Sequence, residues 1–118
     1  MHDIVVQESL ETVLDSLGIV MERFKKIASA DDFVDTDDGI MLMDSISMRL
    51  QLVGEKIKKI DQKSPGLLEK AGIDPYPIIR FRDFISHHYD KADHEVLFDL
   101  CKNDLPVLKD RILQLLRG

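Results

Sequence analysis

The stretch from Arg80 to Lys91 gathers the side chains of this sequence that could act on a phosphate ester. Arg82 offers a permanent positive charge on a planar fork that suits phosphate oxygens. His87 can carry a proton near neutral pH. Together they form a minimal set for cleaving a phosphodiester without a metal ion or another cofactor. The imidazole would transfer protons at the 2′-hydroxyl or the leaving oxygen, and the guanidinium would stabilise charge building on the phosphorus.

Helical geometry gives the two neighbouring histidines different environments. At about 100° per residue, the predicted helix has an apolar arc that contains Phe81, Phe84 and Ile85. His88 falls inside this arc, so we interpret it as a buried, hydrogen-bonded core histidine. His87 falls on the polar arc, four residues after Asp83, whose carboxylate is close enough to hold one imidazole nitrogen. Such a pair would fix the tautomer of His87 and raise its pKa.

A solvated salt-bridge face is the main alternative for this polar cluster, and from residue types alone it is the commoner explanation. Arg82 and His87 are five residues apart, which places them about 140° from each other around one helix. One helix therefore flanks a phosphate imperfectly with these two side chains. A two-fold dimer that sets two such helices side by side would give a cleft with two arginines and two histidines.

The elements that position this stretch are amphipathic helices. Apolar residues three and four positions apart predict a first helix from Asp3 to about Ala30 and a second from about Asp38 to Asp61. On the second helix, Met41, Met48 and Leu52 widen the apolar surface beyond one seam. We therefore expect that helix to pack against two neighbours, one of which could belong to a second subunit.

Prolines and glycines mark the boundaries of the remaining elements. Residues 62–77 predict a loop with one short helical turn from Leu67 to Ala71, and the third helix opens near Pro77. Asp93 caps a fourth helix, which Pro106 either kinks or ends before another helix capped by Asp104. With no strand or repeat indicated, the predicted fold is all-α, an up-and-down bundle of four to five helices.

The segment from Ala30 to Gly39 is acidic. A calcium loop does not fit, because the glycine is misplaced and the closing glutamate of an EF-hand is absent. A solvated turn is the better interpretation, with Thr36 or Asp37 capping the next helix. The sequence assigns no further role to residues 31–38.

Composition limits the class of protein. The 118 residues are 44% hydrophobic with a net charge of -6, which predicts one folded domain over residues 1–118 and argues against broad, non-specific binding to nucleic acid. Any such contact would have to be local. Cys101 is the single cysteine, so an internal disulfide and a thiolate metal cluster are excluded, and we interpret it as a buried, inert thiol. No membrane span or signal peptide is indicated, and a cytoplasmic location is expected.

The focal stretch resembles a known family. Residues 82–89 match the Arg-x4-His-x-Tyr motif of the HEPN superfamily, and specifically its HepT-like ribonuclease toxins. The segment from Arg49 to Glu55 resembles the Gly-Glu segment of the family's second helix. Residues 89–93 and 104–106 resemble the segments that follow the motif. The resemblance covers most of the chain, with Asp83 standing where the family often has asparagine.

This resemblance implies a dimeric helical bundle in which Arg82 and His87 are the metal-independent ribonuclease pair. It also implies a partner, an antitoxin of the minimal nucleotidyltransferase type that can transfer AMP to the motif tyrosine, here Tyr89. Two turns from Arg82, Tyr89 would lie nearly above it, so a bulky negative AMP would obstruct the phosphate site. Two alternatives stay open: a non-catalytic module that presents RNA or nucleotide to a nucleotidyltransferase, and a plain helical adaptor.

Overall fold

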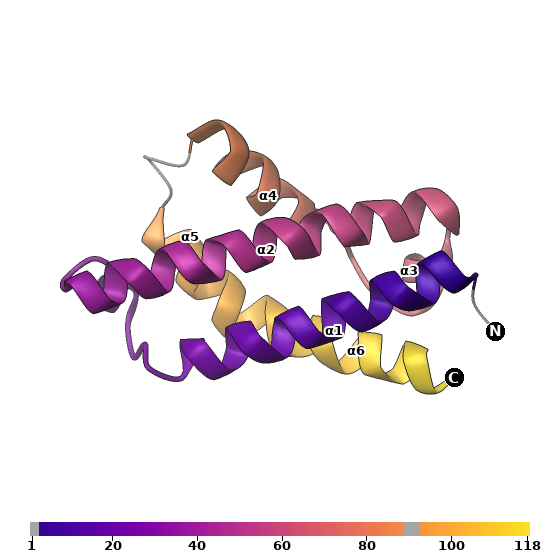
Figure 1. The fold of residues 1–118 in the computed structure, drawn as a ribbon, viewed down its shortest axis with the longest axis horizontal. Coiled ribbons are helices and arrows are strands. Elements are labelled where there is room, and N and C mark those ends of the chain that lie inside the picture. Colours follow the sequence, from indigo (N-terminus) through magenta and orange to yellow (C-terminus); the bar gives the residue numbers. More distant parts are fainter. Residues whose placement is uncertain (1–2, 89–92) are drawn as a thin grey trace.

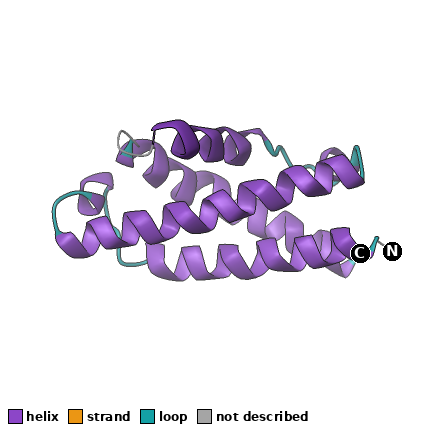
Figure 2. Cartoon of the chain, turned by 45° about the horizontal axis from the view of Figure 1, so that its top comes forward, coloured by secondary structure: helices purple, strands orange, loops and turns teal. Residues whose placement is uncertain are grey.

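The structure, a computed structural model, describes residues 3–88 and 93–118, without the side chains of Phe84, Ser86, His87 and His88. Its α-helices are α1 (Ile4–Phe24), α2 (Asp37–Lys63), α3 (Leu67–Lys70), α4 (Tyr76–His88), α5 (His94–Asp99) and α6 (Leu105–Arg117). A 3₁₀ turn, η1 (Ala30–Phe33), precedes α2, and a π-helical turn, η3 (Leu100–Asp104), joins α5 to α6. The described ranges hold no strand, and the all-α fold is confirmed (Figure 2).

The two longest helices form the frame of the molecule. Figure 1 shows α1 and α2 side by side, and α6 packs along α1 while α4 packs on α2. Both long helices bury an apolar stripe at the spacing that the sequence predicted. Between these helices lie fully buried side chains from α1, α2 and α6, among them Leu10, Leu17, Leu50, Ile57, Leu105 and Ile112. The helix that carries the focal stretch is thus held against a rigid neighbour.

The first helix ends earlier than predicted, at Phe24 rather than near Ala30. Its last turn tightens, because the N–H of Ile27 donates to the carbonyl of Phe24, three residues back, at 2.9 Å. The chain then turns so that Phe33 becomes fully buried. The ring of Phe24 lies 6.2 Å from that of Phe33 and 5.4 Å from that of Phe98. Aromatic packing at this corner outweighs the helical pattern of residues 25–30.

The acidic segment has a structural role that the sequence did not assign. The Asp32 carboxylate accepts hydrogen bonds from the N–H groups of Ala28 and Ser29, and these bonds lower the pKa of Asp32. Asp31 lies 3.2 Å from His94 Nε2 and so connects η1 to the start of α5. A side chain at Gly39 would overlap the carbonyl oxygen of Asp32. The loop is therefore a tightly built corner.

Three further predictions about the scaffold can be compared with the structure. Thr36 caps α2, as predicted, by accepting a hydrogen bond from the N–H of Gly39 at 3.0 Å. Cys101 is buried, as predicted, and burial raises the pKa of its thiol to about 12. Asp104 makes no side-chain cap. Instead the N–H of Leu105 donates to the carbonyl of Leu100, five residues back, just before Pro106. Because proline lacks an N–H, the helical ladder is interrupted there, and a π turn carries the chain through.

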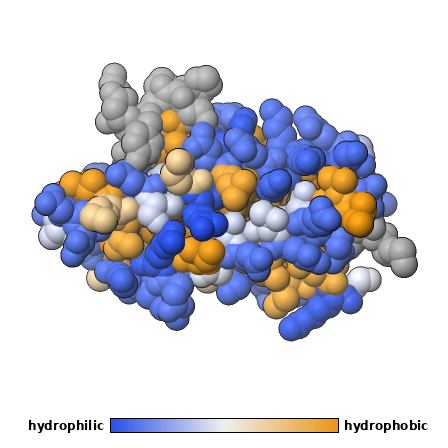
Figure 3. Space-filling view, viewed as in Figure 1, coloured by the Kyte–Doolittle hydropathy of each residue, from blue (hydrophilic) through white to orange (hydrophobic). Residues whose placement is uncertain are grey.

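The face shown in Figure 3 is mostly polar, and apolar side chains form small separate patches among the hydrophilic ones there. Met41 and Met48 are 67% and 69% exposed, so the apolar widening of α2 is not covered by the described part of this chain. A second subunit on that surface stays a prediction. No helix in the described ranges is long and apolar enough to cross a membrane.

Candidate active site

Helix α4 is positioned by its N-terminus and by one buried stripe. The Asp74 side chain accepts a hydrogen bond from the N–H of Tyr76 at 3.0 Å, which satisfies a free donor of the first turn. Ile78, Phe81 and Ile85 are all at most 4% exposed and lie on one side of the helix. Arg82 follows Phe81 directly, so it lies at the margin of this buried stripe.

Arg82 is largely buried by its neighbour α2. Its side chain is 21% exposed, and its aliphatic stem lies on Gly54 of α2. The guanidinium donates from Nη2 to Asp83 Oδ1 at 2.8 Å. Its Nε is buried and has no hydrogen-bond partner among the residues that the structure describes. Arg82 therefore has a fixed stem and a guanidinium whose hydrogen-bonding capacity is only partly used.

The other predicted site residues are placed only in part. The backbone of His87 belongs to α4, as predicted, but its side chain and that of His88 lie outside the described part. Tyr89, the predicted site of AMP transfer, falls outside the described residues altogether. The expected ion pair between Asp83 and His87 therefore stays a prediction. What the structure adds is that Asp83 pairs with the neighbouring Arg82.

The charge distribution favours an anion near Arg82. Residues 49–82 carry eight lysines and arginines against four aspartates and glutamates, although the whole chain has a net charge of -6. This segment contains the C-terminal half of α2 and the first half of α4, and these two helices pack together. An acidic protein thus has a locally basic region around the candidate phosphate ligand.

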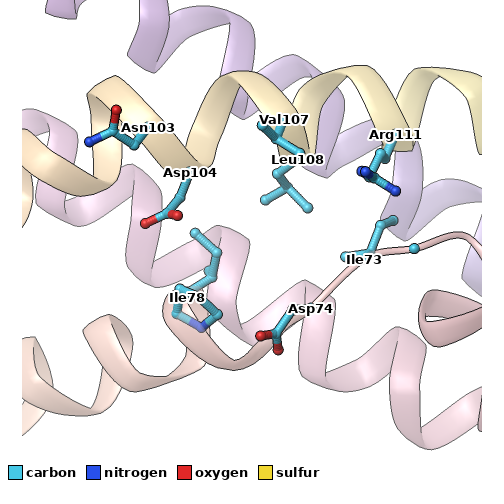
Figure 4. A pocket seen from close by; sticks show the side chains of 10 residues that line it. Ile73, Asp74, Ile78, Asn103, Asp104, Val107, Leu108 and Arg111 are labelled. Carbon is cyan, nitrogen blue, oxygen red and sulfur yellow. The ribbon is translucent and has the colours of Figure 1, made fainter.

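A separate cavity of about 230 Å³ does not suit a phosphate (Figure 4). It lies between the loop that precedes α4 and the start of α6, and its walls include Ile73, Asp74, Ile78, Asn103, Asp104 and Arg111. Burial, together with the charges of Asp99 and Asp74, raises the pKa of Asp104. The cavity is lined by two acidic side chains, Asp74 and Asp104, against the single cation of Arg111, so it offers a phosphate no excess of positive charge. We therefore place the candidate site at Arg82.

Comparison with known protein families shows to which family the chain belongs. A family model described as ribonuclease HepT-like matches residues 17–115. The chain belongs to the HepT-like ribonuclease family. The resemblance drawn from the motif at Arg82 to Tyr89 is thereby confirmed at the level of the family. The matched residues of this HepT-like protein run from within α1 to within α6, so they include the whole of α2 and α4.

A curated relative comes from Methanocaldococcus jannaschii and is named a gamma-glutamylcyclotransferase and proposed RNase. It is 27% identical over 108 residues, which is 91% of the HepT-like chain and 46% of the relative. The chain thus spans about half the length of the protein that it matches. No solved structure matches the chain.

Sequence reasoning missed the contact of Gly54 with Arg82 in this HepT-like protein. Gly54 entered the sequence argument only as part of the segment that resembles the family's second helix. A signal was present, because glycine weakens a helix, and this one stands inside a helix of 27 residues. A buried glycine in that position indicates close approach by a neighbour, but the sequence alone does not say that the neighbour is Arg82.

The pairing of Asp83 with Arg82 leads to a prediction about RNA binding. Replacing Asp83 with Asn removes an ion pair whose members are 21% and 54% exposed, and pairs of this kind contribute about 0.2–1 kcal/mol. Freeing Nη2 should lower the KM for RNA by about 1.5- to 5-fold with little change in kcat. Steady-state cleavage of a short RNA at low salt measures both constants.

Asp110→Asn is the charge-matched control, because Asp110 is exposed on α6 and bonds to Gln114. It should change the KM much less than Asp83→Asn. If Asp83 instead holds His87 in its working tautomer, as the sequence predicted, Asp83→Asn would lower kcat. That result would contradict the assignment of Asp83 to Arg82.

Proposed function

We propose that this protein is a metal-independent endoribonuclease toxin that cleaves RNA through Arg82 and His87. The observation that carries the proposal is the Arg82 side chain, held against α2 in a locally basic region of a HepT-like ribonuclease. The RNase in the name of the archaeal relative agrees with this activity. The proposal covers this chain, whatever the longer relative does.

In the proposed reaction the 2′-hydroxyl oxygen of RNA attacks the adjacent phosphorus and the bond to the 5′-oxygen breaks. His87 takes the hydroxyl proton or supplies a proton to the leaving oxygen. Arg82 stabilises the negative charge that builds on the non-bridging oxygens. The products are a 2′,3′-cyclic phosphate and a 5′-hydroxyl, and the reaction requires a 2′-hydroxyl.

The working form would be a homodimer. Arg82 and His87 are about 140° apart around α4, so two copies of the helix can surround one phosphate better than a single copy can. The exposed Met41 and Met48 offer further apolar surface for a second subunit. RNA is the substrate of this proposed dimer, and a minimal nucleotidyltransferase antitoxin is its protein partner.

Control by the antitoxin would act at Tyr89. Transfer of AMP to the tyrosine adds a bulky group with a negative phosphate two turns from Arg82 in the helical pattern. Such a group would compete with the RNA phosphate for the guanidinium. Intact-mass analysis after co-expression with a neighbouring nucleotidyltransferase should show a gain of AMP that disappears in Tyr89→Phe. If the nucleotidyltransferase neutralises the wild-type protein without modifying it, control would act through binding of the antitoxin and not through Tyr89.

Induced expression in a bacterial host tests the proposed function. The wild-type protein alone should arrest growth and deplete cellular RNA, whereas His87→Ala at equal protein level should do neither. Full toxicity of His87→Ala would refute the ribonuclease assignment. Binding to the nucleotidyltransferase without any RNA cleavage by the purified protein would favour the non-catalytic module instead.

A further inference from the structure

Helix α2 approaches Arg82 so closely at position 54 that only glycine fits there without a shift of the neighbouring atoms. A Cβ atom added at Gly54 would stand 2.8 Å from Cβ of Arg82, 3.1 Å from Cδ and 3.2 Å from Cγ. Carbon atoms in ordinary van der Waals contact are about 3.5–4.0 Å apart. The Cβ of Arg82 is fixed to the backbone of α4, so it cannot move aside by a change of rotamer. With any other residue at 54, α4 would have to shift away from α2.

Gly54 lowers the stability of α2, and its contact with Arg82 explains why a glycine nevertheless stands there. Glycine in a helix interior is less favourable than alanine, and Gly54 stands inside α2. Gly18, which stands inside α1, shows the contrast, since a Cβ there would meet no atom within 4 Å. The two glycines share a helical setting and differ in what lies next to them. Close approach of a neighbour therefore distinguishes Gly54.

We propose that Gly54 is a positioning residue for Arg82. The missing side chain lets the stem of Arg82 lie directly on α2, which sets the direction in which the guanidinium leaves the helix pair. This inference rests on the proposed function, because it concerns how Arg82 meets the RNA phosphate. It adds a residue on a second helix to a site that the motif alone places on α4.

Immobilising the stem has a direct benefit for phosphate recognition. Ordering a long side chain on binding costs conformational entropy, and a stem that is already held loses less. The Nε of Arg82, next to the stem, is buried and has no partner within the described ranges, so the base of the guanidinium is enclosed as well. The tip of the side chain donates from Nη2 to Asp83, which is itself half exposed. A displaced stem would misdirect the guanidinium, and small misplacements of catalytic groups are costly.

The test compares Gly54→Ala with the matched control Gly18→Ala. Gly54→Ala should lower kcat/KM for RNA by about 10- to 100-fold, mainly through kcat. Gly18→Ala should stay within about twofold of the wild type, because it adds a methyl group in open space. If Gly54→Ala alone folds poorly, it is studied in the Gly18→Ala background, where the better helix former offsets part of the loss.

A second readout follows the Arg82 side chain itself and does not need cleavage. The Nε–H of Arg82, identified by its absence in Arg82→Lys, should give a protected nuclear magnetic resonance signal in the wild type. In Gly54→Ala the signal should move towards that of exposed arginines. Unchanged cleavage together with an unchanged Nε–H signal in Gly54→Ala would overturn the proposal. An inactive wild type whose Nε–H signal still depends on Gly54 would refute the ribonuclease function and retain the packing role.

Discussion

Arg82→Ala is expected to lower kcat/KM for RNA cleavage by about 10²- to 10³-fold, the range seen when a single donor to a transition-state oxyanion is removed. The physical reason is that the guanidinium is a charged donor held at the α2–α4 contact, with its stem on Gly54. Because the stem is held, the guanidinium is presented to the phosphate at a high effective concentration. A cation from solution cannot match that concentration when Arg82 is removed. Initial rates on a short RNA at fixed ionic strength measure the loss.

Two variants on the same helix give this result its meaning. Arg82→Lys keeps the charge and most of the stem but loses the planar fork, so its activity should fall between those of the wild type and Arg82→Ala. Arg80→Ala removes an exposed positive charge two residues away and should remain within about threefold of the wild type. A folded Arg82→Ala protein with wild-type activity would contradict the assignment of Arg82 as the phosphate ligand.

His87→Ala is expected to lower kcat for RNA cleavage by about 10²- to 10⁴-fold, because general acid–base catalysis contributes that much. The limb of the pH–rate profile that belongs to the imidazole should disappear as well. His94→Ala serves as the control, since His94 contacts Asp31 at the start of α5 and takes no part in the proposed reaction. An unchanged pH profile in His87→Ala would show that another group transfers the proton.

Mixing the two inactive variants tests whether one site uses both subunits. If Arg82 of one subunit acts with His87 of the other, a mixed dimer of Arg82→Ala and His87→Ala contains one intact site. Random assortment makes about half of the dimers mixed, each with one working site of two, so about a quarter of the wild-type activity should return. Activity that stays at the level of the single variants would mean that each site takes both residues from one chain.

The sequence predicted well wherever hydrophobic periodicity decides the structure. The stripe that contains Leu10 and Leu17 and the one that contains Leu50 and Ile57 mark helices that are buried on one face, and such helices follow from spacing alone. The end of α1 was misplaced because residues 25–30 continue a helical pattern. Their actual path depends on Phe24, Phe33 and Phe98 meeting at one corner, which is a tertiary contact without a local signature.

The candidate site shows the same division. The residue types and their spacing along one helix predict Arg82, Asp83 and His87 as site residues, because a shared helix follows from the sequence pattern. The pairing of Asp83 with Arg82 was not predicted. On a helical wheel Asp83 lies near both Arg82 and His87, and the wheel does not show which of them it contacts. The contact with Gly54 depends on how closely α2 and α4 approach each other, and a periodic pattern in the sequence does not contain that distance.

Cleavage of RNA by Arg82 and His87 through attack of the 2′-hydroxyl requires that hydroxyl and no metal ion. The decisive measurement uses purified protein, a mixed-sequence RNA and its all-deoxy counterpart, all in the presence of EDTA. We predict that the RNA is cut to fragments that end in a 2′,3′-cyclic phosphate, that the deoxy strand stays intact, and that both alanine variants lose the activity. Cleavage of the deoxy strand, or RNA cleavage that survives in both alanine variants, would contradict the account.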